Sequence, residues 1–297
     1  MFTARRLVDG LYAGRHLSPQ TGMGLDFHDY RAYAPGDSLA DLDWKLLGRT
    51  DRYYVRRYRR QTDLQVYIML DATASMNFRG LSKHGKPLPP STHASKYEAG
   101  CLLAAAIAFL TQRQNDRVGL GIFTRKLVKH LPPAGTPSHL QQICTALEKR
   151  LPPPGEGDMA GSLKQLRSVL RRKGLIVLIA DLLDEPAAFF DGIAPLRHAG
   201  HEVIVLQMLT DQERDLGLLA SQTGANSLKL VDLETRLTVP TQMRKVQKEY
   251  ASVMDAHIQQ LRQGCMARGI DHQLVTTTDA PLEALRQYLS KRAAIRR

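Results

Sequence analysis

One carboxylate and two hydroxyl groups recur at alternate positions in the stretch LDATASM, on Asp71, Thr73 and Ser75. They directly follow the apolar run VYIML, which has the composition of a strand buried on both faces. Carboxylate and hydroxyl oxygens suit hard cations, and magnesium keeps several waters, so a few protein oxygens suffice to hold it. The same residues are expected if Asp71 forms an Asx turn and Ser75 caps a helix. The residues alone favour neither alternative.

A second apolar run, GLIVLIAD, ends in Asp181. If both runs are neighbouring parallel strands, their carboxyl ends lie at one edge of the sheet, where doubly wound sheets bind ligands. Asp71 and Asp181 would then converge with the two hydroxyls on one point. This expectation fails if the oxygens point apart, or if a basic side chain fills the gap between the carboxylates.

The chain from Leu64 onward alternates between strand-like and helix-like stretches, which predicts an α/β fold with a doubly wound, mostly parallel sheet. Ser95 is suited to begin one helix and Gly200 to follow the end of another. The expected strands are 64–70, 117–123, 174–181, 201–209 and 270–277, with 125–131 as an antiparallel edge. The expected helices are 95–114, 139–150, 162–172, 186–200, 241–263 and one beginning near 279.

The first 62 residues do not follow this alternation and are rich in Asp, Gly, Arg and aromatic residues. We expect them to form an N-terminal segment packed on the sheet domain of residues 63–297. They include the only tryptophan, Trp44.

The chain of 297 residues carries a net charge of +12, which suits nucleic acid, an acidic protein or anionic lipid as a partner. The segment RTDRYYVRRYRR holds six Arg against one Asp, and a solvated face is its simplest interpretation. Nucleic acid is the less favoured partner. The partner-binding candidates within this segment are Arg56, Arg57, Arg59 and Arg60.

The remaining composition is that of an ordinary globular protein, with 43% hydrophobic and 24% charged residues. The three cysteines have no paired spacing, which argues against a disulfide framework and favours a reducing compartment. The longest apolar run, CLLAAAIAFL, is about half as long as a membrane span requires. These features predict a cytoplasmic protein.

Two motifs resemble known families. LDATASM resembles the Asp-x-Ser-x-Ser motif of von Willebrand factor A domains, the metal-ion-dependent adhesion site, and the expected order of elements fits that fold. The block from PGD at 35–37 to DLDWK at 41–45 is similar to the domain of unknown function 58 family, and this similarity extends over nearly the whole chain from Gly14. That resemblance implies a bacterial partner of MoxR-type AAA+ ATPases, with a proposed role in chaperone-like assembly or metal insertion.

The adhesion-site resemblance assigns a role to each candidate. Asp71 matches the first acid, Thr73 stands at the first serine, Ser75 matches the second serine, and Asp181 matches the acid after the fourth strand. The loop threonine is missing, and Asp158 in GEGDMAGSL is the candidate to replace it. The implied cofactor is Mg²⁺, with an open ligand position for an acidic side chain of a partner.

The chemistry implied by this site is adhesion, because no bond is made or broken. The stretch GLSKHGKP nearly spells a phosphate-binding loop, but Pro87 replaces the residue that would hold magnesium. We therefore expect a non-enzymatic binding or scaffold protein. The alternatives are a nucleic-acid-binding module that uses the basic segments and, with least support, a metal-dependent hydrolase that uses Asp71, Asp158 and Asp181.

Overall fold

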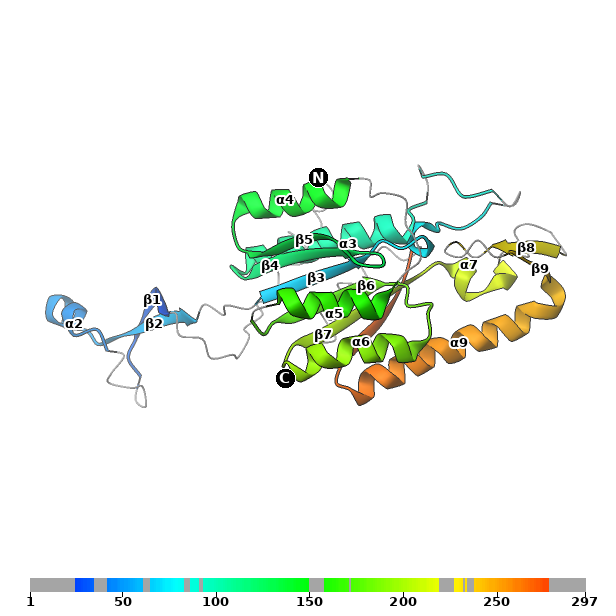
Figure 1. Cartoon of the computed structure of the whole chain (residues 1–297). Helices are drawn as coiled ribbons and strands as arrows, with labels where there is room; N and C mark the ends of the chain where they lie inside the picture. Colours follow the sequence, from blue (N-terminus) through cyan, green and yellow to red (C-terminus); the bar gives the residue numbers. More distant parts are fainter. Residues whose placement is uncertain are drawn as a thin grey trace. The chain divides into compact units, whose positions relative to one another are not determined.

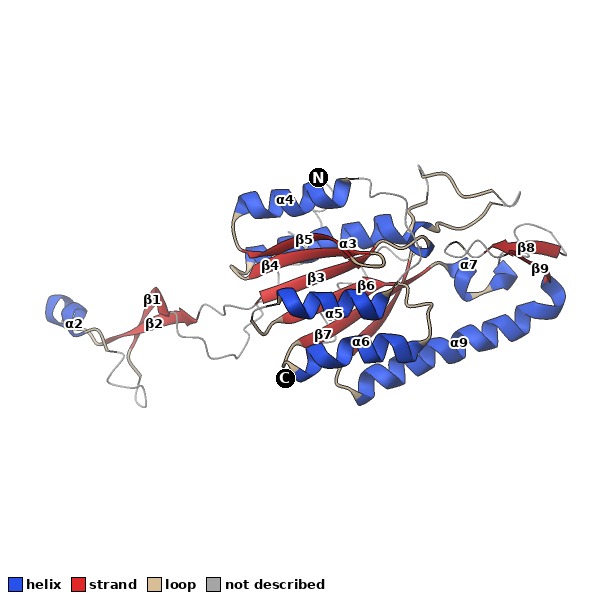
Figure 2. Cartoon of the chain, viewed as in Figure 1, coloured by secondary structure: helices blue, strands red, loops and turns tan. Residues whose placement is uncertain are grey.

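The computed structural model divides the chain into two compact units, His16–Leu64 and a larger unit made of Met1–Arg15 and Gln65–Arg297. Figures 1 and 2 show the elements of both units. That the N-terminal segment packs on the sheet domain stays a prediction. The structure describes residues 25–34, 42–60, 65–82, 86–90, 93–149, 158–170, 172–218, 227–231, 233 and 238–277.

The smaller unit contains a two-stranded antiparallel sheet and one short helix. Strand β1 (Leu25–Ala32) pairs with β2 (Tyr54–Arg60), and α2 (Trp44–Thr50) lies between them in the chain. Helix α2 begins where the Asp43 carboxylate accepts hydrogen bonds from the backbone N–H groups of its first turn. The four arginines proposed to bind a partner lie in β2, and their side chains are outside the described part of the chain.

The larger unit is built on a six-stranded sheet with the order β10-β7-β6-β3-β4-β5. All neighbouring pairs are parallel except β4 and β5, so β5 is the antiparallel edge strand predicted from the sequence. The strands are β3 (Gln65–Asp71), β4 (Arg117–Phe123), β5 (Leu127–Ala134), β6 (Leu175–Ala180), β7 (Glu202–Leu209) and β10 (Asp271–Thr276).

This strand order is that of a doubly wound fold. Counted in chain order within the sheet, the strands run 3-2-1-4-5-6, the order in which the two halves of the sheet are wound in opposite directions. The prediction of a doubly wound, mostly parallel α/β fold is therefore confirmed. The order also agrees with the arrangement that the von Willebrand factor A resemblance implies.

Helices cover both faces of the sheet, as Figure 1 shows. Helices α3 (Lys96–Arg113) and α4 (Pro137–Glu148) lie against one face, and Gly100 of α3 closely approaches the β3 side chain Leu70. Helices α5 (Met159–Val169), α6 (Pro186–His198) and α9 (Met243–Ala267) share a buried core with Tyr67 and Met69, which point to the other face of β3. The central strand β3 is thus buried on both sides.

The helix ends follow the predicted signals. Ser95 caps α3 in a capping box, because its hydroxyl accepts from Glu98 N and its own N–H donates to the Glu98 carboxylate. Helix α6 ends before Gly200, whose φ of 87° is the left-handed conformation that glycine adopts without strain. The helix predicted from 279 lies outside the described residues.

The connection between β7 and α9 contains elements that the sequence pattern did not predict. A one-turn helix, α7 (Asp211–Arg214), follows β7 directly. A hairpin of β8 (Ser227–Val231) and β9 (Thr238–Gln242) then leads into α9. Tyr250 of α9 donates a hydrogen bond to the backbone oxygen of Glu213, which ties α7 to α9.

A cleft at the switch point of the sheet

The candidate site lies where the winding of the sheet reverses. Strands β3 and β6 are neighbours at the centre, and the chain leaves them towards opposite halves of the sheet. In doubly wound sheets this arrangement opens a crevice at the carboxyl ends of the two strands. Asp71 is the last residue of β3, and Asp181 directly follows β6.

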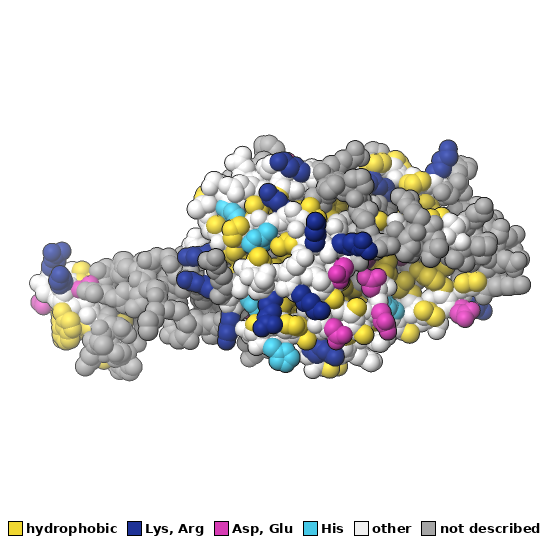
Figure 3. All heavy atoms as spheres, viewed as in Figure 1, with side chains coloured by type: hydrophobic (Ala, Val, Ile, Leu, Met, Phe, Trp, Pro, Cys, Tyr) yellow, Lys and Arg dark blue, Asp and Glu magenta, His cyan; other side chains and the backbone are white. Residues whose placement is uncertain are grey.

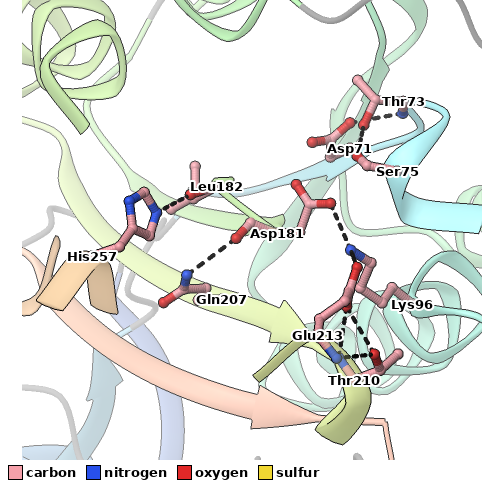
Figure 4. A network of polar contacts seen from close by, with 10 residues as sticks. All are labelled: Asp71, Thr73, Ser75, Lys96, Asp181, Leu182, Gln207, Thr210, Glu213 and His257. Carbon is pink, nitrogen blue, oxygen red and sulfur yellow. Dashed lines mark hydrogen bonds and ion pairs between the residues drawn. The ribbon is translucent and has the colours of Figure 1, made fainter. Parts of the chain in front are cut away.

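The residues after β3 form a tight polar turn. The Asp71 Oδ1 atom accepts a hydrogen bond of 2.8 Å from Thr73 N, and Thr73 Oγ1 lies 3.0 Å from Ser75 Oγ. The Asx-type contact of the simpler alternative is therefore present. Ser75, however, is the first residue of the 3-10 helix η2 (Ser75–Asn77), not its cap, so its hydroxyl stays with Thr73 beside the carboxylate (Figure 4).

Four of the five predicted metal ligands line one cleft of about 350 Å³: Asp71, Thr73, Ser75 and Asp181. The rim adds Asp184 and Glu185, and the walls include Phe123 and Phe189. The described residues that line the cleft thus contain four carboxylates and no Lys, Arg or His. The cleft is suited to a cationic ligand.

A buried lysine lies next to this cleft. Lys96, in the first turn of α3, has no exposed surface, and its ammonium is 2.8 Å from Asp181 Oδ2 and 2.6 Å from Glu213 Oε1. Burial alone would lower the pKa of Lys96, but the two carboxylates outweigh it and raise the pKa. Lys96 is therefore charged.

The position of Lys96 decides whether it blocks the site. Lys96 does not line the cleft, and in Figure 4 its ammonium lies on the side of the Asp181 carboxylate away from Asp71. It bonds Asp181 through Oδ2, and Oδ1 of Asp181 accepts no hydrogen bond from the described part of the chain. Lys96 thus orients Asp181 from behind and does not fill the gap between the two acids.

Lys96 and Glu213 are site residues that the sequence analysis missed. The sequence contained one indication of this pair, which is that Lys96 directly follows the N-cap Ser95. A cation in the first turn of a helix opposes the helix dipole, and when it is buried it needs an acidic partner. Glu213 in turn belongs to a capping box with Thr210 at the start of α7. Figure 4 shows this continuous path from the cleft residue Asp181 through Lys96 to α7.

The loop after β6 is held in an unusual conformation. Leu182 lines the cleft with a φ of 52°, a strained value for a residue with a branched side chain. His257 of α9 contacts its backbone oxygen at 2.7 Å, and Gln207 of β7 donates to the Asp181 backbone oxygen at 3.1 Å. These contacts, drawn in Figure 4, fix the backbone that carries the second carboxylate.

Asp158 stands at a helix start. It caps α5, where its Oδ1 accepts a hydrogen bond of 2.8 Å from Gly161 N, and it is exposed. It is not among the residues that line the cleft. Its role as a replacement for the loop threonine stays a prediction, as do the metal-binding roles of the other four residues.

The donor set fits a small hard cation. In octahedral coordination, magnesium ligands about 2.1 Å from the ion lie about 3 Å from their neighbours. The 3.0 Å between the two hydroxyl oxygens matches this spacing. The described residues contain no group of three or more His, Cys, Asp or Glu side chains that could hold a metal, so the hydroxyls and waters would have to complete the coordination.

The strand order and register define an α/β domain of the doubly wound class. The chain belongs to the DUF58 family, a family of proteins of unknown function, whose sequence model matches residues 29–260. It is 27% identical over 218 residues to the uncharacterized proteins Rv1480 of Mycobacterium tuberculosis and Mb1516 of Mycobacterium bovis. The match covers 72% of this chain and 64% of those relatives, so it spans less than two thirds of their length.

Solved structures give distant likenesses. BatB from Bacteroides thetaiotaomicron is 16% identical with a TM-score of 0.41, and the match covers 78% of this chain and 99% of the BatB chain. An aerotolerance-related membrane protein from Bacteroides fragilis is 17% identical with a TM-score of 0.45, and the match covers 77% of this chain and 99% of that protein's chain. The VWA domain of SpRpn10 is 6% identical with a TM-score of 0.39, and the match covers 75% of this chain and 94% of that domain's chain. These scores are low, so the strand order and register define the fold.

Within the described segments, no helix is long and apolar enough to cross a bilayer.

Proposed function

We propose that this protein is a binding or scaffold protein that docks an acidic side chain of a partner through a magnesium ion held in the switch-point cleft. The observation that supports it is that Asp71, Thr73, Ser75 and Asp181 line the same cleft. Asp71 and Asp181 are each less than 5% exposed, which places their charges in surroundings that favour binding of a cation.

The charges around the cleft give the cation a necessary role. With four carboxylates and no basic side chain among its described lining, the cleft repels an acidic ligand. When bound, Mg²⁺ supplies a compensating positive charge and an open position that a carboxylate of the partner can take. Asp71 and Asp181 would hold the ion, the Thr73 and Ser75 hydroxyls would complete its protein ligands, and Lys96 would keep Asp181 oriented.

A non-enzymatic role agrees with the same lining. The residues that line the cleft offer carboxylates and the hydroxyls of Thr73 and Ser75, the groups that the proposed cation would use as ligands. The metal-dependent hydrolase that uses Asp71, Asp158 and Asp181 is less favoured, because Asp158 caps α5 and does not line the cleft.

The partner that we propose is a MoxR-type AAA+ ATPase or its client, in chaperone-like assembly or metal insertion. This part rests on the family resemblance of the sequence. Because such an ATPase needs cytoplasmic ATP, we propose a cytoplasmic location for the docking surface.

Nucleic acid binding by the basic segment remains the second candidate. The register of β1 and β2 places Asp29 opposite Arg57 and Asp26 opposite Arg59, so acidic residues accompany two of the four arginines along the hairpin. Acidic residues at these register positions lower the local positive charge that phosphate binding requires.

The experiment is a pull-down of a MoxR-type AAA+ ATPase with wild type and Asp71→Ala, each in magnesium and in EDTA. We expect the wild type to capture the ATPase in magnesium but not in EDTA, and Asp71→Ala to capture it in neither. Asp191→Ala removes an exposed carboxylate elsewhere on α6 and should capture like the wild type. Equal capture in all conditions would remove the metal from the mechanism, and no capture in any would remove this partner.

A further inference from the structure

A second concave surface lies between the edge strand β5 and helix α4. In the strand order, β5 and β6 are on opposite sides of β3. The surface has a volume of about 580 Å³, larger than the switch-point cleft. Its apolar lining residues are Val128 and Leu131 from β5 and Ala146 from α4. Its uncharged polar lining residues are Ser138, Gln141, Gln142 and Thr145 of α4, whose aliphatic atoms add to the apolar surface. We call this surface the β5–α4 groove.

The groove carries charge of one sign. The only charged residues in its described lining are Lys129 on β5 and Lys149 at the end of α4. Lys and Arg side chains are spread over the face drawn in Figure 3. Helix α4 itself contains no Lys or Arg, and its one acidic residue, Glu148, is exposed but is not among the residues that line the groove. An occupant with apolar side chains flanked by carboxylates is complementary to this combination.

The strand at the groove has features that argue against pairing with a second copy of the chain. The register between β4 and β5 shifts twice, between Val118/Leu120 and between Ile122/Phe123. Val128 lies at the second shift and is 38% exposed. Pro132 and Pro133 remove two backbone donors from β5. Irregular register and proline are devices that protect sheet edges from self-association.

The lining also argues against nucleic acid. Proteins that bind single-stranded nucleic acid stack bases on aromatic side chains, and the described lining of the groove contains none. We propose that the β5–α4 groove is a second docking site, which takes an acidic and apolar linear segment of a partner protein. This site is independent of the switch-point cleft and of the cation proposed there.

The test uses a fluorescein-labelled peptide of alternating glutamate and valine, with an alternating lysine and valine peptide as the charge control. Fluorescence anisotropy with the full chain should detect binding of the glutamate peptide and not of the lysine peptide. Reversal of both groove lysines, in Lys129→Glu/Lys149→Glu, should weaken binding about tenfold or more, because two attractive contacts become repulsive.

Matched variants separate the groove from the overall charge. Lys164→Glu/Lys248→Glu changes the net charge equally at exposed positions outside the groove and should bind within about twofold of the wild type. Val128→Ser removes apolar contact without a change of charge and should weaken binding severalfold. Asp71→Ala should bind like the wild type, which distinguishes failure of this site from failure of the cleft.

Several results would overturn the proposal. They are absence of glutamate-peptide binding to the wild type, equal loss in the two charge-reversal variants, and stronger binding of the lysine peptide. Stronger binding of a single-stranded oligothymidylate, or a dimer that excludes the peptide, would assign the groove to a different occupant and equally overturn it.

Discussion

Replacement of Lys96 by methionine tests the role assigned to the buried ion network. The Lys96 side chain is fully buried, and its two partners Asp181 and Glu213 have only 6% and 15% of their side-chain surface exposed. Removal of one member of a buried ion network leaves the remaining charge uncompensated and costs about 3–5 kcal/mol. For a unit of this size, each kcal/mol corresponds to roughly 2–4 °C, so we expect the melting temperature to fall by roughly 6–20 °C.

The assay is thermal unfolding followed by circular dichroism, with Lys164→Met as an exposed-lysine control that should melt like the wild type. The triple variant Lys96→Met/Asp181→Asn/Glu213→Gln carries no buried charge in this network and should recover most of the loss. Magnesium should stabilise Lys96→Met more than the wild type, because removal of a nearby positive charge strengthens cation binding at Asp181. A Lys96→Met protein that melts within about 1 °C of the wild type would refute the reasoning.

Two further variants test local features. Ser95→Ala removes the hydroxyl of the α3 capping box and should lower the free energy of unfolding by about 1 kcal/mol, measured by urea denaturation, whereas no loss would contradict the capping role. Burial, assisted by the positive charge of Arg262, lowers the pKa of His272 to about 4. Between about pH 6.5 and pH 4 the unfolded chain therefore binds more protons than the folded chain. Stability should therefore fall by about 1–3 kcal/mol on acidification through that range, and His272→Gln should reduce this dependence; an unchanged pH profile would show that His272 is not its source.

The elements that the sequence predicted are those with strong local signals. Strand β3 and strand β6 are continuous apolar runs, and α3 begins at the serine that its capping box requires. The placement of Asp71 and Asp181 at the ends of neighbouring strands follows from parallel pairing, and both residues line the cleft. The strand signals therefore carried enough information to bring the candidate residues together.

The features that could not be predicted depend on contacts between distant parts of the chain. Lys96 and Glu213 are 117 positions apart, and neither belongs to a motif that links them. The β8–β9 hairpin consists of two strands of only five residues each, which is too short for a clear alternation of apolar and polar residues. Asp158 was selected by its position in a motif, whereas its structural contact is a helix cap.

The most direct test of the docking proposal is a calorimetric titration of Mg²⁺ into the wild type and Asp71→Asn. If the two carboxylates and two hydroxyls of the cleft hold a cation, the wild type should bind one Mg²⁺ and gain thermal stability as the cation concentration rises, with about 2.7 kcal/mol at a hundred times the dissociation constant. Asp71→Asn should lose both effects while its fold in EDTA is unchanged. Identical heats and melting temperatures for the two proteins up to about 10 mM Mg²⁺ would contradict the proposed cation site.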